Sequence, residues 1–212
     1  GNGGYVYHND GTGWSQAADL VPTLHGVGGT GPSDLWVVGA DGTVFRQEGS
    51  LASWPQQPTY SNEILRDAWS PYPGRVWIVG EGGTIIYYDG YTWGDIDPGV
   101  GYDLWTVYAH SDDDLHVGGV GSFTTQRWDG VGWSTESLSG AFVSVFGMWG
   151  AGADQLWAVG FNGFINSWDG SAWNGSVGPG PQVLYDAWGT DFDHFWAVGN
   201  NGEILHYDGS WG

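Results

Sequence analysis

The chain has no cysteine and no lysine, and its 212 residues carry four arginines against 24 aspartates and glutamates. Without cysteine, disulfides and thiolate metal sites are excluded. The formal net charge of −20 argues against binding to nucleic acid or to anionic membranes, because both depend on cationic side chains. A neutral ligand or a basic partner fits this charge better.

Long apolar runs are also missing. No stretch approaches the roughly 18 apolar residues that a membrane helix needs, so membrane insertion is not expected. No stretch repeats apolar side chains with the 3.6-residue period of a helix. Glycine (40) and tryptophan (16) are abundant while charged residues make up 13%, a composition typical of a turn-rich all-β protein rather than a disordered chain.

Two short phrases recur about every 40 residues along the chain. One is an apolar strand closed by glycine, which occurs at residues 35–39, 76–80, 115–119, 156–160 and 195–199. The other is Asp-Gly-x-x-Trp, at residues 10–14, 89–93, 129–133 and 169–173, with degenerate copies at 48–54 and 208–211. A fixed period of this length indicates an array of small structural units.

One repeat divides into four predicted strands. Residues 143–149 form a first apolar run, 155–159 a second, and 164–168 a third that alternates apolar and polar side chains. Asn162-Gly163 between the second and third runs predicts a tight hairpin with positive φ angles. Trp173 begins a weaker fourth strand. Four short antiparallel strands in about 40 residues is typical of a β-propeller blade.

The count of half-repeats predicts one all-β domain over residues 1–212, a five-bladed β-propeller with four-stranded blades. The first-and-second-strand half occurs five times and the third-strand half six times, since residues 1–8 match residues 199–206. We therefore expect the N- and C-terminal strands to pair and close the ring, which removes exposed sheet edges. An incomplete six-bladed ring is the alternative, and the extra strand could instead pair with another copy.

Most repeated residues have a structural explanation. The second-strand tryptophans (Trp36, Trp77, Trp157 and Trp196) are expected to fill the space between neighbouring sheets. His116 replaces tryptophan in one repeat and is interpreted as a satisfied interior or rim histidine, because no second metal ligand lies at a suitable spacing. The aspartate of each Asp-Gly turn is expected to accept hydrogen bonds from nearby backbone amides, with the following tryptophan covering the turn.

A third aromatic set supplies the candidate ligand-binding residues. These are Trp69, Tyr108, Trp149 and Trp188 at the ends of the first strands, together with the carboxylates of Asp67 and Asp186. Gly28 holds the aromatic position in the remaining repeat. Aromatic rings beside polar groups bind sugars, because the ring stacks on the apolar face of the sugar while polar groups take its hydroxyls. The alternative is that these rings pack between blades.

Two acidic loops are candidates for a metal site. Asp112, Asp113 and Asp114 form one loop, and Asp191 and Asp193 lie in the other. Clusters of carboxylate oxygens can bind Ca²⁺, although solvated acidic turns are commoner and neither loop has the EF-hand pattern. No phosphate-binding loop, Ser-His-Asp arrangement or distinct carboxylate pair is identifiable, so no catalytic residue is assigned and no cofactor is expected.

The strings Leu156-Trp157-Ala158-Val159-Gly160 and, near the C-terminus, residues 202–210 resemble the W-x-V-G / D-G-x-x-W propeller repeats of bacterial surface proteins, abundant in myxobacteria. The repeat is also similar to Asp-box (BNR-like) hairpins and to the propellers of photosystem II assembly factors. The resemblance covers essentially the whole chain and implies the propeller fold. It departs from the Asp-box pattern, since aspartate and glycine are adjacent here, so no sialidase residues are carried over.

The sequence favours a non-enzymatic, lectin-like propeller that binds glycans or neutral saccharides at several related sites. The alternatives are a protein-interaction or surface scaffold whose acidic faces meet basic partners, and a glycan-active hydrolase scaffold. We expect an extracellular or cell-surface location from the lysine-free, Trp-, Gly-, Ser- and Thr-rich composition, with a leader removed before Gly1. A homo-oligomer formed through the terminal strands is a further expectation.

Overall fold

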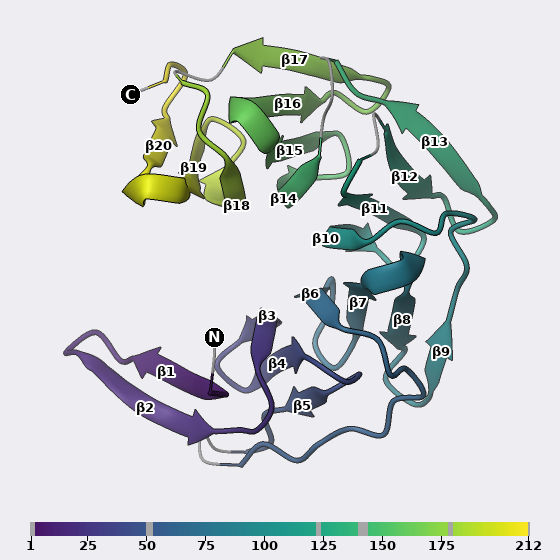
Figure 1. The fold of residues 1–212 in the computed structure, drawn as a ribbon, viewed down its shortest axis with the longest axis vertical. Coiled ribbons are helices and arrows are strands. Elements are labelled where there is room, and N and C mark those ends of the chain that lie inside the picture. The colour runs from purple at the N-terminus through teal and green to yellow at the C-terminus, as the bar shows by residue number, and fades with distance from the viewer. Residues whose placement is uncertain (1–2, 50–52, 122–123, 140–143, 178–179, 212) are drawn as a thin grey trace. The chain divides into compact units, whose positions relative to one another are not determined.

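The computed structural model describes residues 3–49, 53–121, 124–139, 144–177 and 180–211. The regular structure of this part of the chain consists of short β-strands and three single 3-10 turns. Two compact units can be distinguished, Gly1–Asp97 (unit 1) and Pro98–Gly212 (unit 2), and each is described by itself. In both units the strands form small antiparallel sheets (Figure 1).

Unit 1 contains a hairpin and two larger sheets, which we call blade 1 and blade 2. The hairpin pairs β1 (Tyr5–Asn9) with β2 (Trp14–Asp19). Blade 1 has the order β3 (Leu24–Gly31), β4 (Asp34–Gly39), β5 (Val44–Arg46), and blade 2 has the order β6 (Leu65–Trp69), β7 (Val76–Gly80), β8 (Ile85–Tyr88), β9 (Trp93–Asp95). An irregular segment takes the fourth-strand place of blade 1, since Gln57 N donates to Val44 O over 2.8 Å.

Unit 2 contains three sheets, blades 3 to 5, each continuing in chain order from one strand to the next. The strands are β10 (Leu104–Ser111), β11 (Asp114–Gly119), β12 (Thr124–Trp128) and β13 (Trp133–Ser137) in blade 3; β14 (Val145–Gly152), β15 (Gln155–Gly160), β16 (Phe164–Trp168) and β17 (Trp173–Val177) in blade 4; and β18 (Leu184–Asp191), β19 (His194–Gly199) and β20 (Ile204–Tyr207) in blade 5. A single bridge from Tyr207 to Trp211 begins a fourth strand in blade 5.

The predicted four-strand repeat is confirmed, with two refinements. The first strand of blade 4 ends at Gly152, later than the predicted residue 149, because its last residue pairs across the turn with Gln155. In blade 4 the first strand begins at Val145, and residue 143 of the predicted strand lies outside the described residues. The terminal strands pair with their chain neighbours, β1 with β2 and β20 with β19. Pairing of the N- and C-terminal strands with each other stays a prediction, and so does the single domain over residues 1–212.

The turns between second and third strands have the predicted geometry. Their two central residues have positive φ, with 54° and 66° at Asp41-Gly42, 60° and 69° at Asn162-Gly163, and 57° and 78° at Asn201-Gly202. In blade 1, Thr43 N donates to Ala40 O over 3.0 Å and closes the turn. These are primed turns, whose backbone twist matches that of the flanking strands.

Neighbouring blades within a unit approach most closely at their first strands. A side chain at Gly28 would place its Cβ 2.1 Å from Ala68 O, and one at Gly147 would place its Cβ 2.6 Å from the Cα of Asp186. No side chain fits at such distances. Glycine is therefore required at these positions because the backbone of the next blade occupies the space.

Farther from the first strands, aromatic side chains fill the space between neighbouring blades. The second-strand aromatic of one blade contacts the two aromatics that flank the Asp-Gly turn of the next blade. The ring-centroid distances are 5.8 and 6.0 Å from Trp36 to Tyr88 and Trp93, 5.1 and 5.8 Å from His116 to Trp168 and Trp173, and 5.2 and 6.1 Å from Trp157 to Tyr207 and Trp211. The two phrases of the sequence repeat thus meet between blades.

This packing confirms the structural interpretation for Trp36 and Trp157, whose rings contact the next blade. Trp36, Trp77 and Trp157 are buried, while Trp196 of blade 5 is half-buried. Trp93 and Trp173 do more than cover their own Asp-Gly turns, because they also pack against the preceding blade. Trp14, which follows the Asp10-Gly11 turn, is 72% exposed.

Gly163 and Gly202 hold equivalent turn positions in blades 4 and 5. Comparing substitutions at the two positions distinguishes the cost of backbone strain from the cost of steric crowding. A Cβ at Gly163 would lie 1.9 Å from Gly180 O, whereas nothing lies within 4 Å of a Cβ at Gly202. We expect Gly202→Ala to lower the free energy of unfolding by about 1 kcal/mol through its positive φ alone. Gly163→Ala should cost about 1–3 kcal/mol more, because the segment at Gly180 must shift. Urea unfolding of both variants tests this, and equal losses would contradict it.

Candidate functional site

The structure places the four predicted ligand-binding aromatics in different environments. Tyr108 and Trp149 are buried, Trp69 is half-buried, and Trp188 is 61% exposed. The ring of Tyr108 lies against Gly150, and that of Trp149 lies against Gly189, on the first strand of the following blade. Burial raises the pKa of Tyr108 to about 12. At Tyr108 and Trp149 the alternative expectation, packing between blades, therefore describes the structure.

The predicted carboxylates of this set, Asp67 and Asp186, each accept a hydrogen bond from a backbone amide of their own strand. Asp67 Oδ1 accepts a hydrogen bond from Ala68 N, and Asp186 Oδ1 accepts one from Ala187 N, both over 2.8 Å. Asp67 is half-buried and Asp186 is exposed. Asp186 and Trp188 are two residues apart on β18 and so project from one face of blade 5, where Trp188 stacks on Trp196 at 6.3 Å.

The acidic loops use several of their carboxylates within the protein. Asp114 Oδ1 accepts from Arg127 Nε over 3.0 Å, and Asp191 Oδ1 lies 2.8 Å from His194 Nδ1. That contact lowers the pKa of Asp191 and raises the pKa of His194. In the described part of the chain, no three His, Asp or Glu side chains gather as a metal site. The Ca²⁺ expectation for Asp112, Asp113, Asp114, Asp191 and Asp193 stays a prediction.

The aspartates of the Asp-Gly turns accept the predicted backbone hydrogen bonds. Asp89 Oδ1 accepts from Tyr91 N and Thr92 N over 2.8 and 2.7 Å, and Asp129 and Asp169 repeat this pattern. Hydrogen bonding lowers the pKa of all three carboxyl groups, because it stabilises the charged form. The geometry is that of a turn cap, as expected.

The sequence predicts His116 in the interior or at the rim, with its hydrogen bonds made. It lies in the interior, but its ring nitrogens lack hydrogen-bond partners among the described residues. The residue is 1% exposed. Burial and the charge of Arg127 lower the pKa of His116 to about 3. The imidazole is therefore a neutral aromatic spacer between blades, in the place of tryptophan.

A row of aromatic side chains that the sequence analysis missed lies across the first strands of unit 2. Trp105, Phe146 and Tyr185 occupy the second residue of β10, β14 and β18. The rings of Trp105 and Phe146 are 5.0 Å apart, and those of Phe146 and Tyr185 are 5.8 Å apart. Trp105 and Phe146 are half-buried, and Tyr185 is 49% exposed. We call these three residues the aromatic ledge.

A β-bulge creates the ledge. In every blade the pairing register shifts at the second residue of the first strand, as between Leu104 and Thr106 or between Val145 and Gly147. The extra residue of a bulge is turned away from the regular alternation, and bulges commonly redirect side chains at functional sites. In unit 1 the equivalent residues are His25 and Arg66. This column of the repeat varies, and that variation is the sequence signal that could have identified it.

Unit 2, which carries the ledge, is strongly negative. Unit 2 contains 13 aspartates and glutamates and one arginine, Arg127. The guanidinium of Arg127 is already paired with Asp114 and lies 5.7 Å from the ring of Trp168. Positive charge supplied by a partner would therefore meet uncompensated carboxylates on this unit.

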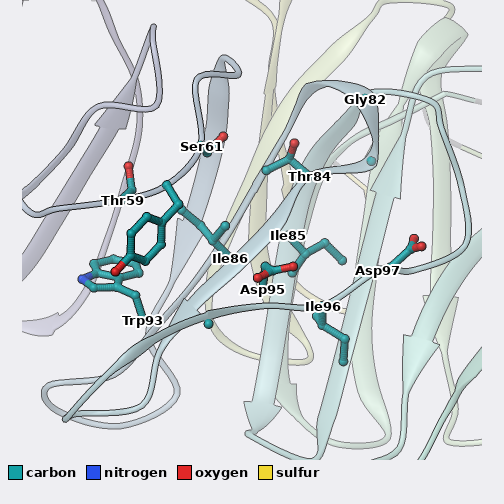
Figure 2. A pocket seen from close by; sticks show the side chains of 13 residues that line it. Thr59, Ser61, Gly82, Thr84, Ile85, Ile86, Trp93, Asp95, Ile96 and Asp97 are labelled. Atoms are coloured by element: carbon teal, nitrogen blue, oxygen red, sulfur yellow. The ribbon is translucent and has the colours of Figure 1, made fainter.

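A second candidate site is a cavity of about 420 Å³ in unit 1 (Figure 2). It lies between the segment at Thr59 and Ser61, which follows blade 1, and strands β8 and β9 of blade 2. Figure 2 shows Trp93 at one end of the lining and Asp97 at the other, with Ile86 and Asp95 between them. The sequence analysis did not identify these residues as a site.

Comparison with known proteins identifies the fold and no family. No protein-family model matches the chain, and no curated protein matches it significantly. Among solved structures, the chain resembles "YCF48 bound to D1 peptide" with a TM-score of 0.67 and 17% identity over 90% of its length, covering 66% of that chain. It resembles the WD40 β-propeller domain of Doa1 with a TM-score of 0.77 and 11% identity over 97% of its length, covering 72% of that chain.

The chain has the β-propeller fold. With five sheets that each begin with the same first and second strands, it is an all-β, five-bladed β-propeller, as predicted. At these identities the likeness concerns the fold alone. Within the described residues, no helix has the length and apolar character to cross a membrane.

The unsatisfied His116 predicts a pH dependence of stability. Its pKa is lowered in the folded protein, so the unfolded chain binds an extra proton as the pH falls below about 6.5. Between pH 8 and pH 5 this group should cost the folded state about 2 kcal/mol. His116→Phe keeps an aromatic ring and removes the titrating group. Urea unfolding at both pH values should show a smaller acid loss for this variant, and equal losses would show that His116 does not stay neutral.

Proposed function

We propose that this chain is a non-enzymatic protein-interaction module whose aromatic ledge binds an arginine-bearing segment of a partner protein. The ledge carries the proposal, because three contiguous rings are directed by β-bulges on a unit with a large excess of carboxylates. The β-bulge recurs at the same position of every first strand. It therefore holds side chains that differ from blade to blade in the same orientation.

The chemistry of the ledge favours a guanidinium group. Arginine is planar and weakly hydrated, and it stacks on aromatic faces with about 0.5–2 kcal/mol of cation–π attraction. The net negative charge of unit 2 adds long-range attraction that speeds association and weakens with salt. Segments with apolar side chains beside the arginine would also cover the half-buried rings of Trp105 and Phe146.

The structural neighbours support a role in protein recognition. One of them is described as bound to a peptide, and the other is a WD40 domain. Because the likeness is one of fold, it makes a peptide-binding role a reasonable use of this architecture and does not identify a partner. We retain the extracellular or cell-surface location as part of the proposal.

The test uses a set of fluorescent peptides in which arginine, lysine and aromatic positions are varied systematically. We expect arginine-containing peptides to bind in 50 mM salt and to lose affinity in 300 mM salt. Tyr185→Ala should weaken binding about fivefold, because one cation–π contact of about 1 kcal/mol is lost.

Val131→Ala is the matched control, since Val131 is 90% exposed in unit 2 and lies outside the ledge. Fluorescence anisotropy measures the affinities, and circular dichroism confirms that each variant is folded. If no peptide binds, or if Tyr185→Ala behaves as Val131→Ala does, the ledge is not the recognition surface.

Glycan binding is a second candidate, favoured by the exposed Trp188. Its ring is solvent-accessible, stacks on Trp196 and projects from the same face as Asp186, so one sugar could stack there with a carboxylate beside it. A monosaccharide panel with added Ca²⁺ should quench tryptophan fluorescence in the wild type and much less in Trp188→Ala. Unchanged fluorescence with every sugar would remove this candidate.

A further inference from the structure

The cavity in unit 1 has a rigid aromatic floor at one end. The ring of Trp93 lies 5.3 Å from Tyr88 and 6.0 Å from Trp36, in an edge-to-face arrangement with the latter. Trp36 is fully buried, so the rings that hold Trp93 are themselves fixed by the core of unit 1. Ile86, which is directly opposite Asp95 in the β8–β9 ladder, extends this apolar surface.

Two carboxylates, those of Asp95 and Asp97, line the cavity shortly after Trp93 in the chain. Trp93 and Asp95 are alternate residues of β9, so they project to the same side about 7 Å apart, and Asp97 lies two residues beyond the end of the strand. Both aspartates line the cavity and are exposed to solvent at its opening. The site thus combines an apolar surface with negative charge displaced from it along one direction.

Among the described copies of Asp-Gly-x-x-Trp, only the copy that ends at Trp93 is followed by carboxylates at these two positions. The residues two and four places after the turn tryptophan are Thr135 and Ser137 in blade 3, and Gly175 and Val177 in blade 4. Nothing in the common packing of the blades requires an acid there. The departure from the repeat therefore points to a property of this one cavity.

The cavity carries negative charge and no positive charge. Its polar side chains are the carboxylates of Asp95 and Asp97 and the hydroxyls of Thr59, Ser61, Tyr60 and Thr84, with no Arg, Lys, His, Asn or Gln in the lining. A neutral sugar could use the hydroxyls but would leave the charge of both carboxylates uncompensated. An alkylammonium group has three donors and no acceptor, and its aliphatic stem suits an apolar floor.

We propose that this cavity binds a lysine side chain of a partner polypeptide. The methylene stem lies on Trp93 and Ile86, and the ammonium group is held by Asp95, with Asp97 adding negative charge at the far end. The volume of about 420 Å³ leaves room for the flanking backbone of the partner beside Thr59 and Thr84. The site is separate from the aromatic ledge and does not depend on it.

The probe is Nα-acetyl-lysine N-methylamide, titrated into the full chain while the indole N–H of Trp93 is followed by NMR. We expect a saturable shift of this signal. The Nε-acetylated analogue has the same stem without the charge and should bind at least tenfold more weakly. Asp95→Asn should reduce the affinity of the lysine probe about fivefold, as expected from loss of one partly desolvated charge pair.

Asp19→Asn is the matched control, because Asp19 is an exposed residue of β2 in the same unit and is not part of the cavity. It removes the same charge and should leave binding nearly unchanged. Tyr185→Ala should also bind the probe normally, which separates this site from the proposed ledge. Equal binding of the two lysine analogues, equal effects of Asp95→Asn and Asp19→Asn, or saturation by a monosaccharide instead of lysine would each overturn the proposal.

Discussion

The structure depends on one contact between neighbouring blades, in which the second-strand aromatic of one blade packs on the aromatic pair around the Asp-Gly turn of the next. Trp36 on Tyr88 and Trp93, and Trp157 on Tyr207 and Trp211, are two examples. Each repeat therefore supplies both halves of a contact that it cannot complete alone. This explains why the two sequence phrases recur together, since burial of these large rings stabilises the contact between blades.

The same contact determines which residues are available for recognition. Positions between blades are occupied by aromatic rings, by aliphatic side chains such as Val38 and Leu65, or by glycines such as Gly28 and Gly147, which face the backbone of the next blade. The second residue of each first strand is released from this packing by a bulge, and the residues after the turn tryptophan lie beyond it. Variation at these positions costs the fold little, so they can differ between blades and serve different ligands.

Much of the blade could be predicted because its signals are local. Alternating apolar strands, Asn-Gly and Asp-Gly turns and the spacing of tryptophan identified the strands, the primed turns and the turn caps at Asp89, Asp129 and Asp169. The candidate site was less predictable. Tyr108 and Trp149 occupy the same sequence position as Trp188, yet they pack on Gly150 and Gly189 of the next blade while Trp188 is exposed. Sequence position alone does not say whether a neighbouring blade covers a ring.

The sequence by itself determined the all-β architecture, the four-strand blade and the strong negative charge, because each follows from periodicity, turn chemistry or composition. Only the tertiary structure decided that Trp105, Phe146 and Tyr185 form one row, and that Asp95 and Asp97 open onto a cavity floored by Trp93. These groupings join residues tens of positions apart, or depend on a bulge that reverses the side-chain alternation. The physical reason is that exposure and proximity are properties of packed sheets, which no single repeat contains.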